Sequence, residues 1–153
     1  MSNETQWLRG KPYHRSAEAL AKALGNKRVR VYKNLHLDCW SIKSMEGEDK
    51  GKVIAYSDEV AMHTVEFIVS VAGRKRVLRE KKKNVHAYVD GRVRKPMESP
   101  TYTDDFFGLR YNPYEGAAFV DEYQRQWWSV YYCHLNHGGG VVATNIVPTK
   151  GEF

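Results

Sequence analysis

The stretch Val65-Glu66-Phe67-Ile68-Val69-Ser70-Val71 decides the class of fold expected for this chain. Apolar residues occupy positions 65, 67, 69 and 71, and this spacing places side chains on one face of a β-strand. Ala72-Gly73 then breaks the pattern. We therefore expect a strand with one buried face over residues 65–71, and a fold that depends on sheet packing.

Shorter alternating patterns occur on both sides of this stretch. They cover residues 28–31, 35–40, 53–56, 84–89, 92–94, 127–135 and 141–143. The pair Asp90-Gly91 lies between two of these runs and is typical of a two-residue hairpin turn. The prolines within residues 95–100 exclude that segment from a sheet interior, so it is interpreted as a connection within one domain.

One helix is expected near residues 16–25. Ser16 suits an N-cap, Gly25-Asn26 suits a C-terminal stop, and the apolar residues between them follow helical spacing. Residues 1–15 are polar and are interpreted as an extended arm. The prediction is a single β-rich α+β domain over residues 1–153, with one N-terminal helix against a curved antiparallel sheet or a small barrel.

The composition indicates a packed domain, and the N-terminal sequence favours a reducing compartment. The hydrophobic fraction is 42% and the aromatic fraction is 12%, enough for a core without metal or disulfide support. We find no apolar leader at the N-terminus and no run of about 18 apolar residues. A cytoplasmic location is therefore expected, with Cys39 and Cys133 as buried free thiols.

Positive charge is concentrated near the middle of the chain. The net charge is +6, but residues 74–95 carry ten Lys and Arg against two acidic residues, a net of +8. The rest of the chain is therefore slightly acidic. Charge concentrated in this way predicts an anionic partner.

The basic segment is expected to lie on the surface as a loop or a short helix, because Val77 and Leu78 are its only apolar residues before position 84. The predicted hairpin would bring the second basic run, which begins at Arg92, beside the first. Nucleic acid, RNA or DNA, or a nucleoprotein complex is the expected partner. The candidate cationic contacts are Arg74, Lys75, Arg76, Arg79, Lys81, Lys82, Lys83, Arg92, Arg94 and Lys95.

His86 offers an alternative, catalytic interpretation. It follows the lysines directly and shares a predicted strand face with Tyr88. A metal-independent ribonuclease could use such a histidine as general acid or base, with nearby Lys or Arg stabilising phosphorane charge and His36 as a second member. No nuclease motif accompanies it, so a strand histidine packed on a neighbour is the simpler interpretation, and a binding protein is favoured over an enzyme.

Aromatic residues dominate the predicted strand over residues 127–135. Alternation separates Trp127, Tyr131 and Cys133 from Trp128 and Tyr132. One face must be core, and the other could stack nucleic-acid bases or contact a protein. Tyr88 and Trp128 are therefore added to the candidate binding residues.

No cofactor or metal is expected. His134 and His137 lack a matching cluster of cysteines or carboxylates, and Gly138-Gly139-Gly140 lacks the Lys-Ser/Thr of a phosphate-binding loop, so it is interpreted as a turn. The acidic pairs Asp104-Asp105 and Asp121-Glu122 are interpreted as surface charge.

The runs Lys83-Asn84-Val85-His86-Ala87-Tyr88-Val89 and Val31-Tyr32-Lys33-Asn34-Leu35 resemble small uncharacterised proteins of phages and other mobile elements, over about residues 28–95. The resemblance implies action on host nucleic acid or on a host nucleoprotein machine. A protein that binds such a machine would act as its inhibitor. An assembly protein that binds an acidic protein surface remains a further alternative.

Overall fold

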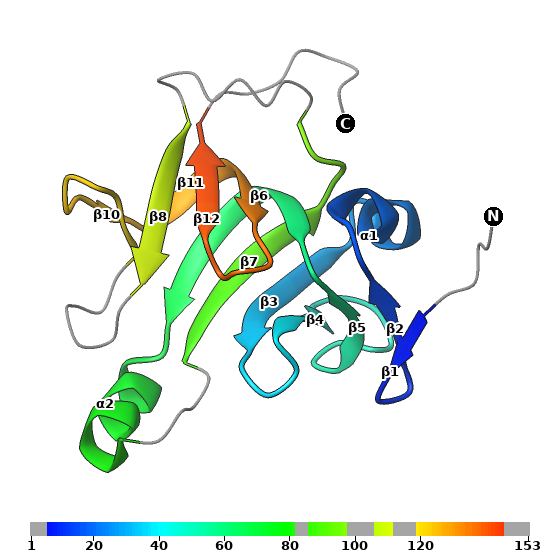
Figure 1. The fold of residues 1–153 in the computed structure, drawn as a ribbon, viewed down its shortest axis with the longest axis horizontal. Helices are drawn as coiled ribbons and strands as arrows, with labels where there is room; N and C mark the ends of the chain where they lie inside the picture. Colours follow the sequence, from blue (N-terminus) through cyan, green and yellow to red (C-terminus); the bar gives the residue numbers. More distant parts are fainter. Residues whose placement is uncertain (1–5, 82–85, 98–105, 112–118, 146–153) are drawn as a thin grey trace.

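The computed structural model of the chain describes residues 6–81, 86–97, 106–111 and 119–145. Within these ranges twelve strands and two helices follow one another along the chain (Figure 1). They are β1 Gln6–Leu8, β2 Lys11–His14, α1 Ala17–Leu24, β3 Arg28–Asn34, β4 Cys39–Ser44, β5 Val53–Ser57, β6 Val60–Val69, α2 Val71–Glu80, β7 Ala87–Val93, β8 Phe107–Tyr111, β9 Phe119–Val120, β10 Gln126–Trp127, β11 Ser129–Leu135 and β12 Val141–Thr144.

All twelve strands belong to one open, strongly curved sheet, in the order β1-β2-β5-β4-β3-β7-β6-β11-β12-β8-β9-β10. Pairing is antiparallel except between β2 and β5, which run parallel. The expected β-rich fold is confirmed, whereas the alternative of a closed barrel is wrong. The expectation of a single N-terminal helix is also wrong, because α2 follows β6 at the far end of the sheet from α1 (Figure 1).

The expected helix is α1, and its signals act as the sequence predicts. The Ser16 hydroxyl accepts a hydrogen bond from the Ala19 amide, and the helix ends at Gly25. Leu20 is fully buried against the sheet core. No helix in the described part of the chain is long and apolar enough to cross a membrane.

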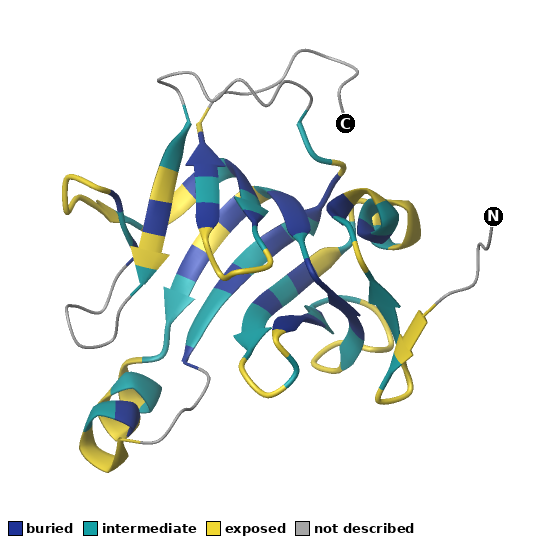
Figure 2. Cartoon of the chain, in the orientation of Figure 1, coloured by how far each residue is buried: buried dark blue, intermediate teal, exposed yellow. Residues whose placement is uncertain are grey.

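The core is formed by buried residues from both halves of β6 together with residues of its neighbours, and these buried positions are dark blue in Figure 2. In β6, Val60 and Met62 have even residue numbers and Val65 and Phe67 have odd ones, but all four side chains are buried. A regular strand would place these two pairs on opposite faces. The sequence of β6 therefore requires a change of phase between Met62 and Val65.

A β-bulge provides this change of phase. His63 pairs with Arg92 and Glu66 with Asp90, so Thr64 and Val65 together face the single residue Gly91. Thr64 has a φ of 54°, which is unusual for a β-branched residue. A Cβ atom on Gly91 would lie 2.9 Å from the His63 carbonyl oxygen, so the bulge requires a glycine at this position of β7.

The hairpin predicted at Asp90-Gly91 is therefore wrong. Both residues lie inside β7, which pairs with β3 on one side and β6 on the other. The strand expected over residues 35–40 is also corrected, since residues 35–38 form a turn and Leu35 is exposed. The described part of residues 1–15 forms the β1–β2 hairpin.

Replacing Gly91 with alanine should destabilise the fold by about 2 kcal/mol, because the added methyl group must displace the backbone of the bulge. Urea denaturation measures the change in the free energy of unfolding. Gly108→Ala in β8 is the matched control, since a Cβ there meets its nearest atom only at 4.0 Å. Equal stability of the two variants would contradict the packing argument at Gly91.

Cys39 and Cys133 are free and buried, as the sequence predicts. Burial, with the nearby Asp58 carboxylate, raises the pKa of Cys39 to about 11, and burial also raises the pKa of Cys133. Thiolate is therefore scarce at pH 8, and the native protein should react slowly with a thiol reagent. Denatured, non-reduced protein should titrate two thiols, and a count of zero would show a disulfide.

Candidate nucleic-acid interface

Helix α2, with its C-cap, carries five of the ten cations in the basic segment that the sequence singles out. Arg74, Lys75, Arg76 and Arg79 lie within the helix and Lys81 is its C-cap, with a φ of 54°. Val77 is the one buried residue of α2, and the helix projects from the end of β6 as a largely exposed element (Figure 2). Lys82 and Lys83 lie outside the described residues.

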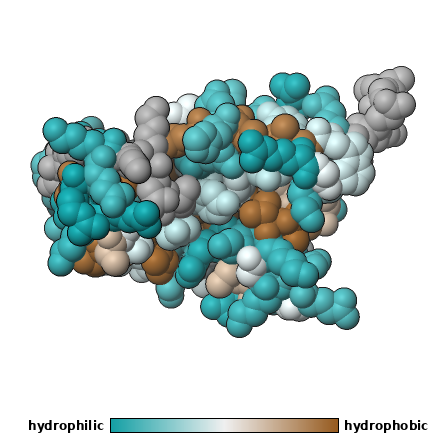
Figure 3. All heavy atoms as spheres, turned by 90° about the horizontal axis from the view of Figure 1, so that it is seen from below, coloured by the Kyte–Doolittle hydropathy of each residue, from teal (hydrophilic) through white to brown (hydrophobic). Residues whose placement is uncertain are grey.

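The side of α2 opposite to its contact with the protein is cationic. Successive helix residues are about 100° apart, so Lys75 and Arg79, each two positions from Val77, lie about 160° away from it. Both are exposed. The surface over α2 is accordingly hydrophilic in the view from below (Figure 3).

One carboxylate balances part of this charge. Arg76 Nε lies 3.1 Å from Glu80 Oε2, and Arg79 Nη2 lies 3.8 Å from Glu80 Oε1. Glu80 is the only acidic residue from position 71 to 81, so five cations leave a net of +4. Exposed ion pairs of this kind contribute little to stability, and a polyanion could displace them.

The start of α2 is held by backbone contacts with the segment that precedes β7. The Ser70 amide donates to the His86 carbonyl oxygen at 2.7 Å, and the Ser70 hydroxyl accepts from the Gly73 amide at 3.2 Å. A Cβ on Gly73 would lie only 2.9 Å from His86 Cβ. The helix is thus positioned by close backbone approach and caps, with little apolar burial.

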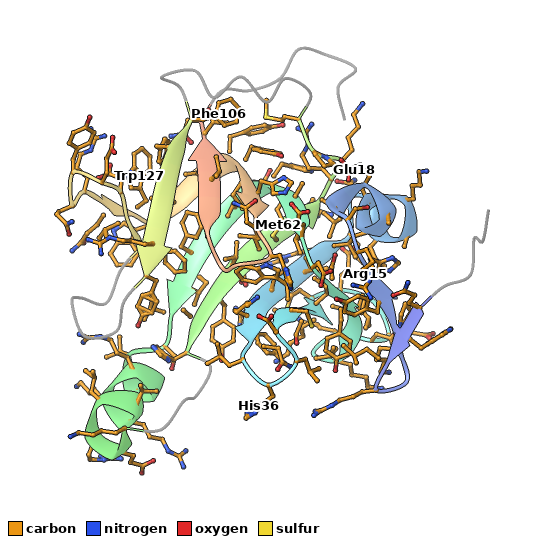
Figure 4. All side chains as sticks on the ribbon, in the orientation of Figure 1. Arg15, Glu18, His36, Met62, Phe106 and Trp127 are labelled. Atoms are coloured by element: carbon orange, nitrogen blue, oxygen red, sulfur yellow. The ribbon has the colours of Figure 1, made fainter. Side chains whose placement is uncertain are left out.

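These contacts also place the candidate catalytic histidine. His86 is only 8% exposed, and its ring meets the Tyr111 ring edge-on at 5.3 Å. A phosphate could not approach a side chain enclosed in this way without movement of α2. His36 is exposed at the β3–β4 turn (Figure 4), so the described geometry favours the packed strand histidine over the ribonuclease interpretation.

The two basic runs are separated, contrary to the predicted hairpin. Because β7 is a continuous strand of seven residues, about 20 Å separates its start beside α2 from its end at Val93. Arg92, Arg94 and Lys95 lie at that far end, near α1. Arg94 is also buried at 4% exposure. The structure therefore divides the single predicted patch into two cationic sites.

Tyr88 lies at the α2 end of β7 but is engaged within the sheet. Its ring meets Tyr32 edge-on at 6.0 Å, and the Arg30 guanidinium lies 5.3 Å from its centre. Arg30 in turn forms two hydrogen bonds of 2.8 and 2.9 Å with Asp90. Tyr88 thus belongs to a ladder across β3 and β7 and is half-buried.

Trp128 is an exposed aromatic residue whose backbone is hydrogen-bonded to β6 shortly before α2 begins. The predicted long strand over residues 127–135 is interrupted at Trp128, which separates β10 from β11. Its carbonyl oxygen accepts from the Phe67 amide at 2.9 Å, three residues before the cap of α2, and its side chain is 55% exposed. Trp127 instead packs on Phe107, with ring centres 4.4 Å apart (Figure 4).

Asp121 organises the turn beside Trp128, a role that the sequence interpretation missed. Its carboxylate accepts hydrogen bonds from the Tyr123 and Arg125 amides, Arg125 Nε and Trp127 Nε1, at 2.7–3.0 Å. The side chain is 1% exposed, not a surface charge. The hydrogen bond from the amide two residues on is that of an Asx-turn, so an aspartate at the start of a turn is the sequence signal that could have indicated this role.

The turn held by Asp121 presents further groups to solvent. Tyr123 is 71% exposed, and the Arg125 guanidinium lies 5.2 Å from the centre of its ring. Together with Trp128, these side chains provide apolar faces and positive charge on the same part of the chain. Such a combination suits base stacking and phosphate contact.

The histidines near residue 135 form contacts within the protein. His134 Nε2 lies 2.8 Å from Glu59 Oε1, and His137 Nε2 lies 3.7–3.8 Å from carboxylate oxygens of Asp58 and Asp38. No group of three His, Cys, Asp or Glu side chains suited to a metal ion occurs among the residues that the structure describes.

Comparison with known proteins identifies the lineage of the chain. Residues 23–143 match the family described as Mycobacterium phage L5 gene 82 protein. The gene 82 protein of Mycobacterium phage L5 is 39% identical over 101 residues, covering 61% of this chain and 76% of that protein. No solved structure matches. The chain therefore belongs to this phage protein family, which confirms the resemblance seen in the sequence.

The Asp121 turn should make stability depend on pH. Burial acts to raise the pKa of Asp121, but the hydrogen bonds from Trp127, Arg125 and Tyr123 outweigh it and lower the pKa to about 2. The carboxylate thus stabilises the fold above its unfolded pKa of about 4, and this contribution is lost as the pH falls toward 2.

Asp121→Asn should accordingly melt below the wild type at pH 6, and the difference should narrow as the pH is lowered from 5 to 2.5. Thermal denaturation followed by circular dichroism measures this. Glu122→Gln, at the exposed neighbouring position, should give no such trend. A constant difference for Asp121→Asn across the pH range would show that its charge is not responsible.

Proposed function

We propose that this member of the gene 82 phage protein family is a small nucleic-acid-binding protein whose helix α2 contacts the phosphate backbone. The observation that carries the proposal is the arrangement of α2, with five cations against one carboxylate and a single buried residue. A helix this poorly buried contributes little to the core. The basic sequence of α2 is better explained by the cations that the helix presents to solvent.

The dimensions of α2 suit a nucleic-acid duplex. Its ten residues span about 15 Å, and a helix with its side chains is 10–12 Å across. The major groove of B-form DNA is about 12 Å wide. Lys75 and Arg79, opposite Val77, would face the bound strands, while Arg74 and Arg76 on the flanks would reach phosphates at the groove edges.

The turn held by Asp121 supports the same proposal. Trp128 and Tyr123 are exposed aromatic residues. Stacking of such a side chain on an unpaired base does not depend on the nucleotide sequence, because every base has a π-face. Arg125 adds a cation at this turn. RNA or DNA with single-stranded and paired parts would therefore gain contacts from both the helix and the turn.

The biological target that we propose is host nucleic acid, either free or exposed within a host nucleoprotein complex. A phage protein bound there would act as an accessory factor or an inhibitor. Binding through phosphates is independent of sequence and weakens strongly with salt. This distinguishes the proposal from a catalytic role, which the burial of His86 makes less suitable.

The test removes charge from the outer side of α2. The triple variant Lys75→Gln, Arg79→Gln, Lys81→Gln retains long side chains at three exposed positions. Binding to a fluorescent oligonucleotide, single-stranded and duplex, is measured by anisotropy from 50 to 200 mM salt. If all three residues contact phosphate, the slope of log affinity against log salt should decrease in magnitude by about two to three.

The matched control carries the same loss of charge at the other end of the sheet, as Lys11→Gln, Lys50→Gln, Lys52→Gln. Those lysines are exposed on β2 and on the turn between β4 and β5. Their removal should change the slope much less than the α2 variant does. A folded α2 variant with wild-type affinity and slope would refute the proposal.

A further inference from the structure

A groove beside α1 is a second candidate binding site, independent of α2. It lies between α1 and the ends of β6 and β7, with a volume of about 860 Å³. Its walls include Ala21 and Lys22 from the helix, His63 from β6, and the segment from Val93 to Lys95 that ends β7. Figure 4 labels Glu18 on α1, beside the end of β7.

The groove is preformed by backbone hydrogen bonds. The Asn26 amide, just after α1, donates to the Val93 carbonyl oxygen at 2.6 Å, and the Val93 amide donates to the Lys27 carbonyl oxygen at 3.1 Å. The Arg94 amide donates to the Ala61 carbonyl oxygen at 3.0 Å. A ligand would therefore enter a shape that the sheet already maintains, at a low entropic cost of ordering.

The surface of the groove combines an apolar floor with cations. Most of its lining is apolar, and its volume lies within the range of small-ligand and peptide sites. Lys22 and Lys95 are exposed at its rim. Glu18 is the one carboxylate among the described residues that line it, so the groove carries an excess of positive charge.

The Arg94 side chain is a buried cation in the wall of this groove. Its Nε donates to the Lys95 carbonyl oxygen at 2.7 Å, and its guanidinium lies 5.1 Å from the centre of the Tyr132 ring. The positive potential reaches His63, whose pKa is lowered by burial first and then by Arg94 and Arg92. The His63 imidazole is therefore positioned to respond to charge in the groove.

We propose that this groove binds an acidic peptide segment of a partner protein, with an apolar residue in the groove and carboxylates at the exposed Lys22 and Lys95. Charge complementarity favours an anionic occupant. The apolar floor favours a peptide over nucleic acid, because a phosphate backbone would leave that surface unused. The partner would thus be held at the opposite end of the sheet from α2.

The probe is a fluorescein-labelled nonapeptide in which leucine and phenylalanine anchors are flanked by glutamates, with its glutamine counterpart as the matched peptide. Anisotropy should show binding of the acidic peptide to the full chain, and at least ten-fold weaker binding of the glutamine peptide. No binding of the acidic peptide, or equal binding of both peptides, would overturn the proposal.

Charge reversal locates the site. Lys22→Glu with Lys95→Glu should weaken the acidic peptide at least ten-fold, whereas Lys50→Glu with Lys52→Glu, an equal change of net charge, should not. The α2 triple variant should bind the peptide as the wild type does, so this test is separate from that of the nucleic-acid proposal. Unchanged binding by the Lys22→Glu, Lys95→Glu protein would refute the site.

His63 supplies a readout that nonspecific adhesion would not change. Carboxylates bound in the groove that His63 lines favour the protonated imidazole, so the peptide should raise the pKa of His63 as followed by NMR titration. An unchanged His63 titration at saturating peptide would place the peptide elsewhere. An oligonucleotide is the competing ligand. If it displaces the peptide and also raises the pKa of His63, the groove is assigned to nucleic acid instead.

Discussion

The close backbone approach at Gly91 is the constraint on which the rest of the structure depends. It permits the bulge at Thr64 and Val65, which returns Phe67 to the same core face as Met62. Since β6 joins β7 on one side to β11 on the other, both halves of the sheet meet at this strand. Without the bulge, one half of β6 would turn its apolar residues to solvent.

Because β7 runs through Asp90-Gly91 without a turn, it also determines where positive charge lies on the molecule. A turn at Asp90 would have folded the second basic run back against the first and formed one patch. A continuous strand instead carries Arg92 and Lys95 toward α1, about 20 Å from α2. The molecule therefore presents two cationic regions of different character, one an exposed helix and the other an apolar groove with a buried arginine.

Local signals were sufficient to predict the elements whose cause is local. Ser16 and Gly25 bound α1 as expected, and the alternation from Val65 to Val69 belongs to the central strand. The pair Asp90-Gly91 led to a wrong prediction because glycine suits both a hairpin turn and the strand position opposite a bulge. Which of the two forms depends on Thr64 and Val65, almost thirty positions earlier in the chain. The change of phase from Met62 to Val65 is recognised only once all four apolar residues of β6 are known to share the core. Of the candidate site, the exposed position of the cations on α2 was predictable, whereas the burial of His86 depends on tertiary contacts. The role of Asp121 was missed although its hydrogen-bond partners lie within six residues.

The attachment of α2 links its stability to its charge. Val77 is its one buried residue, so caps and the Gly73 contact with His86 hold the helix in place. Five cations close together repel one another, and Glu80 offsets only part of that repulsion. A polyanion along the outer side of α2 would remove this repulsion while leaving the caps intact. Under the proposed function, binding of a polyanion and the local stability of α2 would therefore strengthen one another.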